Sequence, residues 1–205
     1  MTVVIADYGM GNLDSIANMV RKVGGSPLIS GEPHVIAQAG KLVLPGVGSF
    51  DKGMSALAET GVKDAVYAAA NQGAVLLGIC LGMQLLMDGS EEGALPGLGL
   101  VPGRVCRFPK GAGLKVPHMG WNHAHPTKDS PLFSWDSGET PRYYFVHSYY
   151  ANCAEQTDVA ATTHYGLTFA SAFSRNNILG VQFHPEKSHR FGMTLIRHFL
   201  DFAHA

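Results

Sequence analysis

Short apolar segments alternate with helical patterns in the N-terminal half of the chain. In these segments apolar residues occupy successive positions, as in strands that a parallel sheet buries on both faces. Between them, apolar residues recur at helical spacing, and Gly24 and Gly25 end the first such pattern. This alternation predicts an α/β fold with a mostly parallel central sheet flanked by helices. The predicted strands are residues 3–7, 41–44 and 74–79, and the predicted helices are residues 13–23, 64–71 and 81–87.

The C-terminal half has a different pattern. Several strand-like segments follow one another without helices between them, which predicts an additional, partly antiparallel strand region. A final apolar segment returns to the parallel sheet, and an amphipathic helix closes the chain. No internal repeat or linker interrupts the pattern, so we expect a single domain over residues 1–205. The predicted strands here are residues 104–108, 142–150, 159–163, 169–174 and 178–183, and the closing helix is residues 193–202.

The chain is nearly neutral and poor in charge. Its 205 residues include 15 Lys and Arg against 16 Asp and Glu, and charged residues make up 15% of the total. Soluble domains usually contain about 25%. Near neutrality argues against nonspecific nucleic-acid binding, which needs a basic surface. Hydrophobic residues make up 46% of the chain, which argues against disorder.

The sequence also predicts where the protein is found. It has no apolar stretch of about 18 residues, so we expect no membrane span. The N-terminus lacks a basic region, and Asp7 interrupts its apolar run, so we do not expect a signal peptide. The three cysteines, Cys80, Cys106 and Cys153, are odd in number and widely spaced. They favour free thiols in a reducing cytoplasm over a disulfide framework.

The sharpest chemical motif is Gly-Ile-Cys-Leu-Gly at residues 78–82, between a predicted strand and a predicted helix. It has the form of a nucleophile elbow with cysteine in place of serine. A nucleophile on a tight turn needs small neighbours, which Gly78 and Gly82 supply. The start of the helix favours the thiolate of Cys80. We also expect the N–H group of Leu81 to face a developing oxyanion. The alternative is a structural cysteine in a glycine-flanked turn.

A cysteine nucleophile needs a base, and the base needs a group to orient it. His184 and Glu186 follow a predicted strand and are separated by Pro185, which disfavours helix before it. Residues two apart in extended chain point the same way. Glu186 is therefore expected to hold the imidazole of His184 in the tautomer that a base requires.

Three further histidines, His118, His123 and His125, lie in one loop-rich stretch. Their spacing matches no zinc motif, and no pair of cysteines accompanies them. We therefore expect no metal site.

Two motifs together resemble the signature of class I glutamine amidotransferases. They are Gly-Ile-Cys-Leu-Gly-Met-Gln at residues 78–84 and Phe-His-Pro-Glu at residues 183–186. The resemblance extends from residue 3 to the end of the chain and implies a flavodoxin-like sheet. Within the family, three more segments resemble HisH, the glutaminase subunit type of imidazole glycerol phosphate synthase. These segments are residues 7–13, 115–122 and 144–149.

The resemblance implies a reaction. Cys80 would attack the side-chain amide of L-glutamine, and His184 would protonate the departing ammonia. A water activated by His184 would then hydrolyse the glutamyl thioester and release glutamate. No cofactor is implied.

The resemblance also implies which other residues form the site. Residues 45–48, Pro-Gly-Val-Gly, are similar to the family's oxyanion strand. The implied oxyanion donors are Leu81 and either Val47 or Gly48, and the implied substrate-binding residues are Gln84, His147, Ser148 and Tyr149.

A partner is implied as well. In this subfamily the glutaminase forms a heterodimer with a (β/α)₈-barrel cyclase of the HisF type. Ammonia passes through the barrel to a ribonucleotide, and the products are imidazole glycerol phosphate and AICAR. Asn12, Tyr144 and Lys187 match positions near that interface. We expect the face that bears them to be poor in charge. We also expect cyclase ligands to switch the glutaminase on through residues 45–48.

Three other interpretations stay open at this point. One is a glutaminase for another synthase, such as those of purine, anthranilate or pyridoxal phosphate synthesis. A second is a cysteine hydrolase or peptidase with a similar elbow. The third is a catalytically silent flavodoxin-like binding module.

Overall fold

A parallel sheet forms the centre of the computed structural model, which describes residues 2–109, 114–133 and 138–202. Its neighbouring strands all pair in parallel. The order 2-1-3-4 followed by a fifth strand is that of a flavodoxin-like doubly wound fold. In spatial order the strands are β2 (Ser26–Ser30), β1 (Thr2–Ala6), β3 (Lys41–Leu44), β4 (Val75–Ile79) and β13 (Ile178–Val181).

Beyond β13 the same sheet continues with mainly antiparallel strands. β12 (Leu167–Arg175) pairs antiparallel with β13, and β10 (Tyr149–Cys153) follows it. The outer strands are β6 (Val101–Arg107), β5 (Met87–Ser90), β11 (Val159–Tyr165) and the two-residue β8 (His125–Pro126). A separate antiparallel pair consists of β7 (His118–His123) and β9 (Arg142–His147). The predicted combination of a parallel sheet with an antiparallel region is confirmed.

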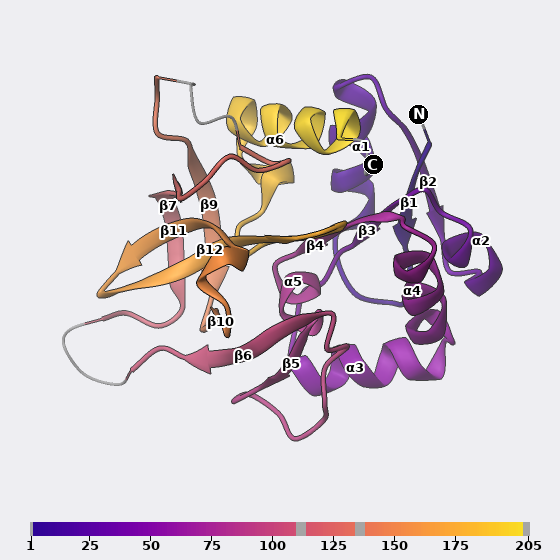
Figure 1. Cartoon of the computed structure of the whole chain (residues 1–205), viewed down its shortest axis with the longest axis horizontal. Coiled ribbons are helices and arrows are strands. Elements are labelled where there is room, and N and C mark those ends of the chain that lie inside the picture. Colours follow the sequence, from indigo (N-terminus) through magenta and orange to yellow (C-terminus); the bar gives the residue numbers. More distant parts are fainter. Residues whose placement is uncertain (1, 110–113, 134–137, 203–205) are drawn as a thin grey trace.

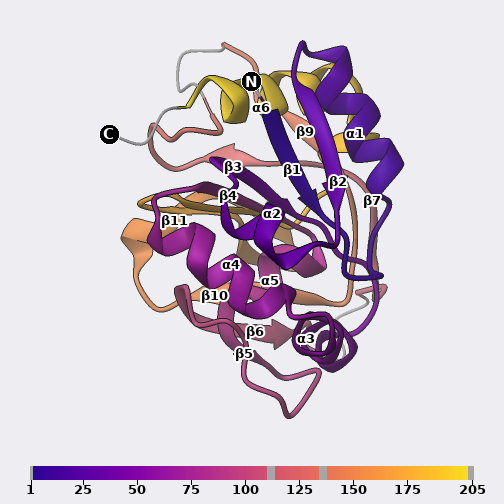
Figure 2. The ribbon, with the colours of Figure 1, turned by 90° about the vertical axis from the view of Figure 1, so that its right-hand side faces the viewer.

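Helices cover both faces of the parallel sheet (Figures 1 and 2). One face carries α1 (Leu13–Lys22) and α6 (His189–Asp201). The other carries α2 (Pro33–Ala37), α3 (Phe50–Glu59), α4 (Val62–Asn71) and α5 (Leu81–Leu85). Short 3₁₀ turns occur at Gln156–Asp158 and at Pro185–Lys187, the latter labelled η2. Successive residues of β3 enter opposite core layers, Leu42 and Leu44 one and Val43 the other. This explains why its sequence is apolar throughout.

The closing helix begins at His189, before the predicted start at residue 193, and two further predicted elements are wrong in extent. The helix predicted over residues 81–87 ends at Leu85, and Met87 already belongs to β5. Carbonyls at the end of that helix accept N–H groups from the loop at residues 97–101, which stops it. The strand predicted over residues 142–150 is two strands, because the chain leaves β9 and enters the large sheet after Ser148.

Other elements were not predicted. β7 alternates polar and apolar residues in a short, histidine-rich segment, which gives no clear strand signal. α3 contains Gly53, which lowers helix propensity but allows close contact with the Leu85 side chain. The remaining unpredicted elements are β2, α2, β5 and β8.

No helix among the described residues is long and apolar enough to cross a membrane. The three cysteines are free thiols, as predicted; Cys80 and Cys153 are buried and Cys106 is half-buried.

The close packing of α5 on β3 yields a stability prediction. A Cβ atom at Gly82 would lie 1.9 Å from the carbonyl oxygen of Leu44, which is backbone and cannot move aside. We expect Gly82→Ala to lower the free energy of unfolding by about 1–3 kcal/mol or more. Gly40→Ala is the matched control, because a Cβ atom at that position would have nothing within 4 Å. Chemical denaturation of both variants measures the difference, and equal stabilities would contradict this packing.

Candidate active site

Cys80 occupies a strained turn between β4 and α5. Its φ of 55° and ψ of −110° lie outside the regions that non-glycine residues prefer. Strain of this kind is characteristic of functional sites. The flanking glycines are required by close contacts, since a Cβ at Gly78 would lie 2.7 Å from the Met83 backbone. The structure therefore contains the nucleophile elbow that the sequence predicts.

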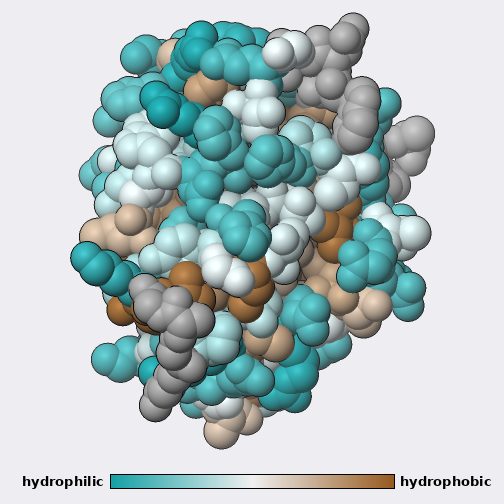
Figure 3. All heavy atoms as spheres, turned by 90° about the vertical axis from the view of Figure 1, so that its left-hand side faces the viewer, coloured by the Kyte–Doolittle hydropathy of each residue, from teal (hydrophilic) through white to brown (hydrophobic). Residues whose placement is uncertain are grey.

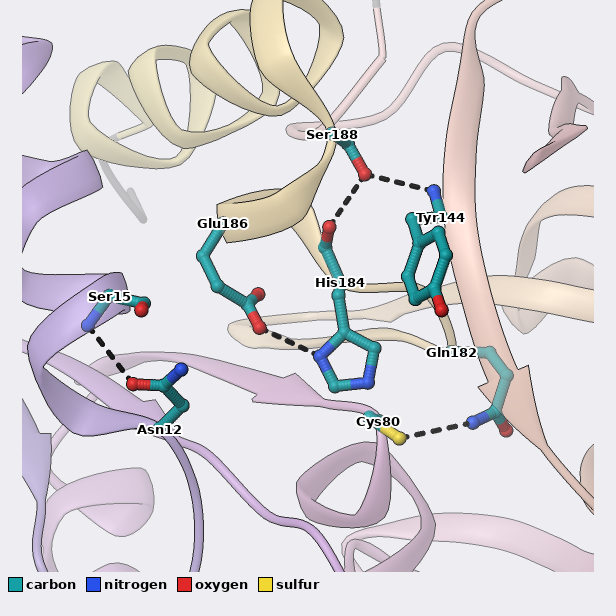
Figure 4. A network of polar contacts seen from close by, with 8 residues as sticks. All are labelled: Asn12, Ser15, Cys80, Tyr144, Gln182, His184, Glu186 and Ser188. Carbon is teal, nitrogen blue, oxygen red and sulfur yellow. Dashed lines mark hydrogen bonds and ion pairs between the residues drawn. The ribbon is translucent and has the colours of Figure 1, made fainter. Parts of the chain in front are cut away.

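His184 and Glu186 form a buried pair beside this turn. Nδ1 of His184 lies 2.7 Å from Oε1 of Glu186, and both side chains are 3% exposed. A carboxylate can only accept, so Nδ1 carries the proton. Figure 4 shows the imidazole ring between Glu186 and Cys80, with Nε2 on the side of the sulfur. Nε2 has no hydrogen-bond partner among the described residues. The orientation needed for proton exchange with the thiol is thus present.

The surroundings of His184 favour its charged form. Burial alone lowers the pKa of the imidazole, but Cys80 and Glu186 outweigh that effect and raise it to about 10. The sulfur acts through its proximity to the ring and as a thiolate charge, and the carboxylate acts through its hydrogen bond and its charge. His184 therefore holds a proton at neutral pH, with Nε2 on the side of the Cys80 sulfur.

A pocket of about 320 Å³ opens in front of Cys80. This size suits a small-molecule ligand. It brings together the predicted oxyanion and substrate-binding residues, although they come from three separate segments of the chain. Among the residues that line it are Val47, Gly48, Cys80, Leu81, Gln84, His147, Ser148, Tyr149 and His184.

The oxyanion donor at Leu81 is not free. Its N–H group donates to the carbonyl of Gly46 at 3.3 Å. The expectation that this N–H faces the pocket is therefore wrong for this conformation, because the neighbouring strand supplies a carbonyl instead. In the segment after Gly46, Val47 is 46% exposed and Gly48 has a φ of +114°.

Several residues of the site were not singled out from the sequence. Gln182 is fully buried, and its Nε2 lies 3.8 Å from the sulfur of Cys80. Glu92 lines the pocket, and its Oε2 accepts the N–H of Phe50 at the start of α3. Tyr8 donates its hydroxyl to the carbonyl of Pro45. Such residues look ordinary in sequence, and only their positions in the fold give them a role.

The predicted partner residues lie close to the catalytic pair. His184 donates its backbone N–H to the carbonyl of Tyr144 at 2.9 Å. The ammonium of Lys187 lies 5.7 Å from the centre of the Tyr144 ring. Asn12 is exposed and caps α1, which packs against η2, the turn that contains Lys187. The three residues thus surround the same end of the molecule.

The three histidines of the loop-rich stretch do not gather at one place. Within the described residues, no group of three or more His, Cys, Asp or Glu side chains is placed to hold a metal ion. His118 is buried and hydrogen-bonded to His147, and the rings of His123 and His125 lie 6.1 Å apart.

The chain matches a known family over almost its whole length. The sequence model described as "Glutamine amidotransferase class-I" matches residues 4–202. The chain therefore belongs to the class I glutamine amidotransferases and is an enzyme of that class.

Relatives with high similarity in sequence carry the name of one subfamily. The chain is 48% identical over 199 residues to "Imidazole glycerol phosphate synthase subunit HisH 2" of Methanococcus maripaludis, with 97% of this chain and 98% of the relative covered. It is 48% identical over 206 residues to "Imidazole glycerol phosphate synthase subunit HisH" of Syntrophotalea carbinolica, with 97% and 99% covered.

Solved structures agree on the fold. PurLQS from Thermotoga maritima has a TM-score of 0.74 at 17% identity, covering 98% of this chain and 97% of that one. A structure named glutamine amidotransferase has a TM-score of 0.73 at 18% identity, covering 98% and 97%. The predicted fold class is therefore confirmed.

The charged pair predicts a pH dependence of stability. The pKa of His184 is raised in the folded state, so its stabilising contribution is complete below the unfolded pKa of about 6.5. The contribution is lost as the pH rises toward 10. We expect Glu186→Gln to lower the free energy of unfolding by roughly 3–5 kcal/mol near pH 6 and by progressively less toward pH 10.

Denaturant titrations across this pH range measure the effect. The control is Glu32→Gln, because Glu32 also pairs with a histidine, His34, but both side chains are 73% exposed. That variant should show no such pH trend. A destabilisation by Glu186→Gln that stays constant from pH 6 to 10 would contradict the assignment of charge.

Proposed function

We propose that the chain is the glutaminase subunit of an imidazole glycerol phosphate synthase and serves histidine biosynthesis. The observation that carries this proposal is the buried Cys80–His184–Glu186 arrangement at the mouth of a pocket of about 320 Å³. Relatives of this chain at 48% identity are named as HisH subunits of that synthase. The free thiols of the chain fit a reducing compartment, so we place the reaction in the cytoplasm.

The reaction follows from the protonation state of the site. The Cys80 thiolate attacks the side-chain carbonyl carbon of glutamine, and the carbonyl oxygen takes up the negative charge. His184 gives its Nε2 proton to the leaving nitrogen, and ammonia departs as the glutamyl thioester forms. Neutral His184 then takes a proton from water, whose oxygen attacks the thioester. Glutamate leaves, and the thiolate–imidazolium pair is restored.

Polar groups around the pocket suit the amino-acid end of glutamine. Glu92 supplies a carboxylate that can accept hydrogen bonds from the substrate's ammonium group. Ser148, Tyr149 and Gln84 also line the pocket. These contacts hold the substrate so that its amide reaches the sulfur.

The oxyanion hole forms by rotation of one peptide group. The carbonyl of Gly46 and the N–H of Val47 belong to the same peptide, and this carbonyl accepts the N–H of Leu81. Turning that peptide over frees the N–H of Leu81 and brings the N–H of Val47 toward the pocket. Both donors then become available to the oxyanion in one movement. The resting conformation is accordingly poor in glutaminase activity.

The partner surface surrounds Tyr144. Trp121 is paired with Tyr144 across β7 and β9 and is 45% exposed, and Met119 on the same strand is 62% exposed. Figure 3 views the side of the molecule that carries β7, where hydrophobic side chains form small areas among hydrophilic ones. Large exposed apolar residues are typical of the centre of an interface. With Asn12 and Lys187 they form the surface that we assign to a (β/α)₈-barrel cyclase.

The expectation of a charge-poor face does not hold here. Arg142 lies 5.8 Å from the Trp121 ring, and Lys187 lies over Tyr144. Both cations are exposed, so the apolar residues are bordered by positive charge. A cyclase that docks here would present acidic groups around an apolar centre. Ammonia released at Cys80 then passes into the barrel of the docked subunit.

Removal of the nucleophile tests the glutaminase role. We expect Cys80→Ala to abolish imidazole glycerol phosphate formation from glutamine in the complex with a cyclase. Formation from added ammonia should stay unchanged, because that route bypasses the thiolate. Product formation from both nitrogen sources is measured in the same preparation. Glutamine-dependent activity that survives in Cys80→Ala would exclude the proposal, and loss of both activities would point to failed assembly.

Partner binding should switch the enzyme on. One oxyanion donor is worth about 10²–10³ in kcat, so the cyclase with its nucleotide bound should raise the rate of glutamine hydrolysis by at least that factor.

The exposed tryptophan should contribute to the affinity for the cyclase. Trp121→Ala should weaken cyclase binding by about 30-fold, as loss of a central aromatic residue does. Leu28→Ala is the control, since Leu28 is also 45% exposed but lies on β2. Titration calorimetry and ammonia release measure both effects. Equal hydrolysis with and without the cyclase and its nucleotide would contradict the peptide switch.

A further inference from the structure

His147, which lines the pocket, and its neighbour His118 are two buried histidines that the proposed reaction does not use. Nδ1 of His118 lies 3.0 Å from Nε2 of His147, and Nδ1 of His147 lies 2.7 Å from the carbonyl oxygen of Tyr149. His118 is 3% exposed and His147 is 6% exposed. His118 belongs to β7, His147 ends β9, and Tyr149 begins β10. This pair therefore connects the two-stranded sheet to the wall of the glutamine pocket.

The direction of each hydrogen bond is fixed by its acceptor. A carbonyl oxygen can only accept, so Nδ1 of His147 carries a proton. In a neutral ring Nε2 of His147 is then an acceptor, and the proton of the next bond must be on Nδ1 of His118. Nε2 of His118 in turn accepts from Nδ2 of Asn122 at 3.2 Å. In both rings, therefore, Nδ1 carries the proton and donates, and Nε2 accepts.

Backbone groups fix the outer end of this chain of bonds. Nδ2 of Asn122 also donates to the carbonyl of His164 at 3.0 Å. Its Oδ1 accepts the N–H of His123 at 2.8 Å. Turning the amide over would place a carbonyl oxygen against another carbonyl oxygen. The amide, and with it both imidazole tautomers, is held in one orientation.

The inner end reaches the nucleophile. The Tyr149 carbonyl also accepts from Nε2 of Gln84 at 3.2 Å. The same nitrogen donates to Oε1 of Gln182 at 2.9 Å, which leaves Nε2 of Gln182 directed at the sulfur of Cys80. Figure 4 shows this last contact. From Asn122 on β7 to Cys80 after β4, each donor meets an acceptor.

The environment keeps both rings neutral. Burial lowers the pKa of His118 to about 4. Burial likewise lowers the pKa of His147, to about 3, although its bond to the Tyr149 carbonyl acts in the opposite direction; His118 and the charged His184 add to the lowering. The His118 ring stacks on Tyr165 and Phe145, with ring centres 4.0 and 4.8 Å away. Neither ring can therefore turn or gain a second proton without loss of packing.

We propose that His118 and His147 are positioning residues that fix the Tyr149 carbonyl, and through it Gln84 and Gln182, in the geometry that binds glutamine next to Cys80. Their hydrogen bonds run to each other and to the backbone at residue 149, so they act on the nucleophile through that backbone. The inference rests on the proposed function only for its kinetic consequence. The ordered tautomers are a property of the folded chain itself.

A direct test uses the isolated chain labelled with ¹⁵N-histidine. Long-range imidazole spectra should show both His118 and His147 as the neutral form protonated at Nδ1, from pH 5 to 8. His118→Asn and His147→Asn assign the two signals, because each removes one ring. If either ring is protonated at Nε2, or titrates between pH 5 and 8, the proposal is overturned. This result does not depend on what the enzyme acts on.

A kinetic test uses the cyclase complex. His118→Phe keeps an aromatic ring for stacking but removes the donor to His147, so we expect KM for glutamine to rise by about 3- to 10-fold, the effect of one hydrogen bond. The change in kcat should be smaller than that in KM. In His118→Asn the side-chain amide nitrogen can take the place of Nδ1, so KM should return toward the wild-type value.

His198→Phe is the matched control, since His198 also lies 3.2 Å from a backbone carbonyl, that of Leu132, but outside the pocket. It should leave KM unchanged. Thermal unfolding of each variant shows whether it is folded. A KM unaffected by His118→Phe, or an equal rise in His118→Phe and His118→Asn, overturns the positioning role. Absence of glutaminase activity in the wild-type complex would instead contradict the proposed function. The imidazole spectra would then still test the predicted tautomers of His118 and His147.

Discussion

The close approach of α5 to the end of β3 is the constraint on which the site depends. Gly82 lies against the carbonyl of Leu44, where no side chain fits. This contact forces the tight turn at Cys80, which adopts a positive φ. It also brings the segment after β3 alongside the nucleophile, where Gly46 meets the N–H of Leu81. The strained turn and the position of the oxyanion segment therefore both depend on one packing contact.

Parallel pairing supplies the rest of the catalytic geometry. β4 and β13 are neighbours in register, with Ile79 opposite Val181, and the N–H of Cys80 donates to the carbonyl of Val181 at 2.8 Å. The residues that follow two parallel strands meet at the same edge of the sheet. Cys80 and His184 are far apart in sequence, yet this register places them together. The hydrogen bond between His184 and Tyr144 then attaches the catalytic edge to the two-stranded sheet.

The sequence predicted the parts of this arrangement that depend on local backbone chemistry. A cysteine between two glycines after an apolar strand, and a His-Pro-Glu triplet after another, each have a short-range physical reason. β3 was also predicted, because its burial on both faces makes its sequence continuously apolar. Resemblance to a known family added Val47, Gly48, Gln84 and residues 147–149, which the structure places around one pocket.

What was not predicted depends on contacts between distant segments. The apolar pattern of residues 142–150 continues across Ser148, so it carries no sign that the chain exchanges one sheet for another there. The bond between Leu81 and Gly46 joins two backbone groups, which no residue type reveals. Gln182 is a buried amide in an otherwise apolar strand end, and its partners are known only once β4 and β13 are paired. The tautomers of His118 and His147 likewise depend on which carbonyls lie at the ends of the chain of bonds.

The change of sheet at Ser148 places the proposed docking surface and the catalytic residues on different sheets. Met119 and Trp121 project from a two-stranded sheet and belong to neither of the two buried core layers. Their side chains can therefore vary with the surface they face while the packing around Cys80 stays the same. In evolutionary terms, such a chain can acquire a new docking specificity through β7 and β9 and retain its chemistry in the parallel sheet.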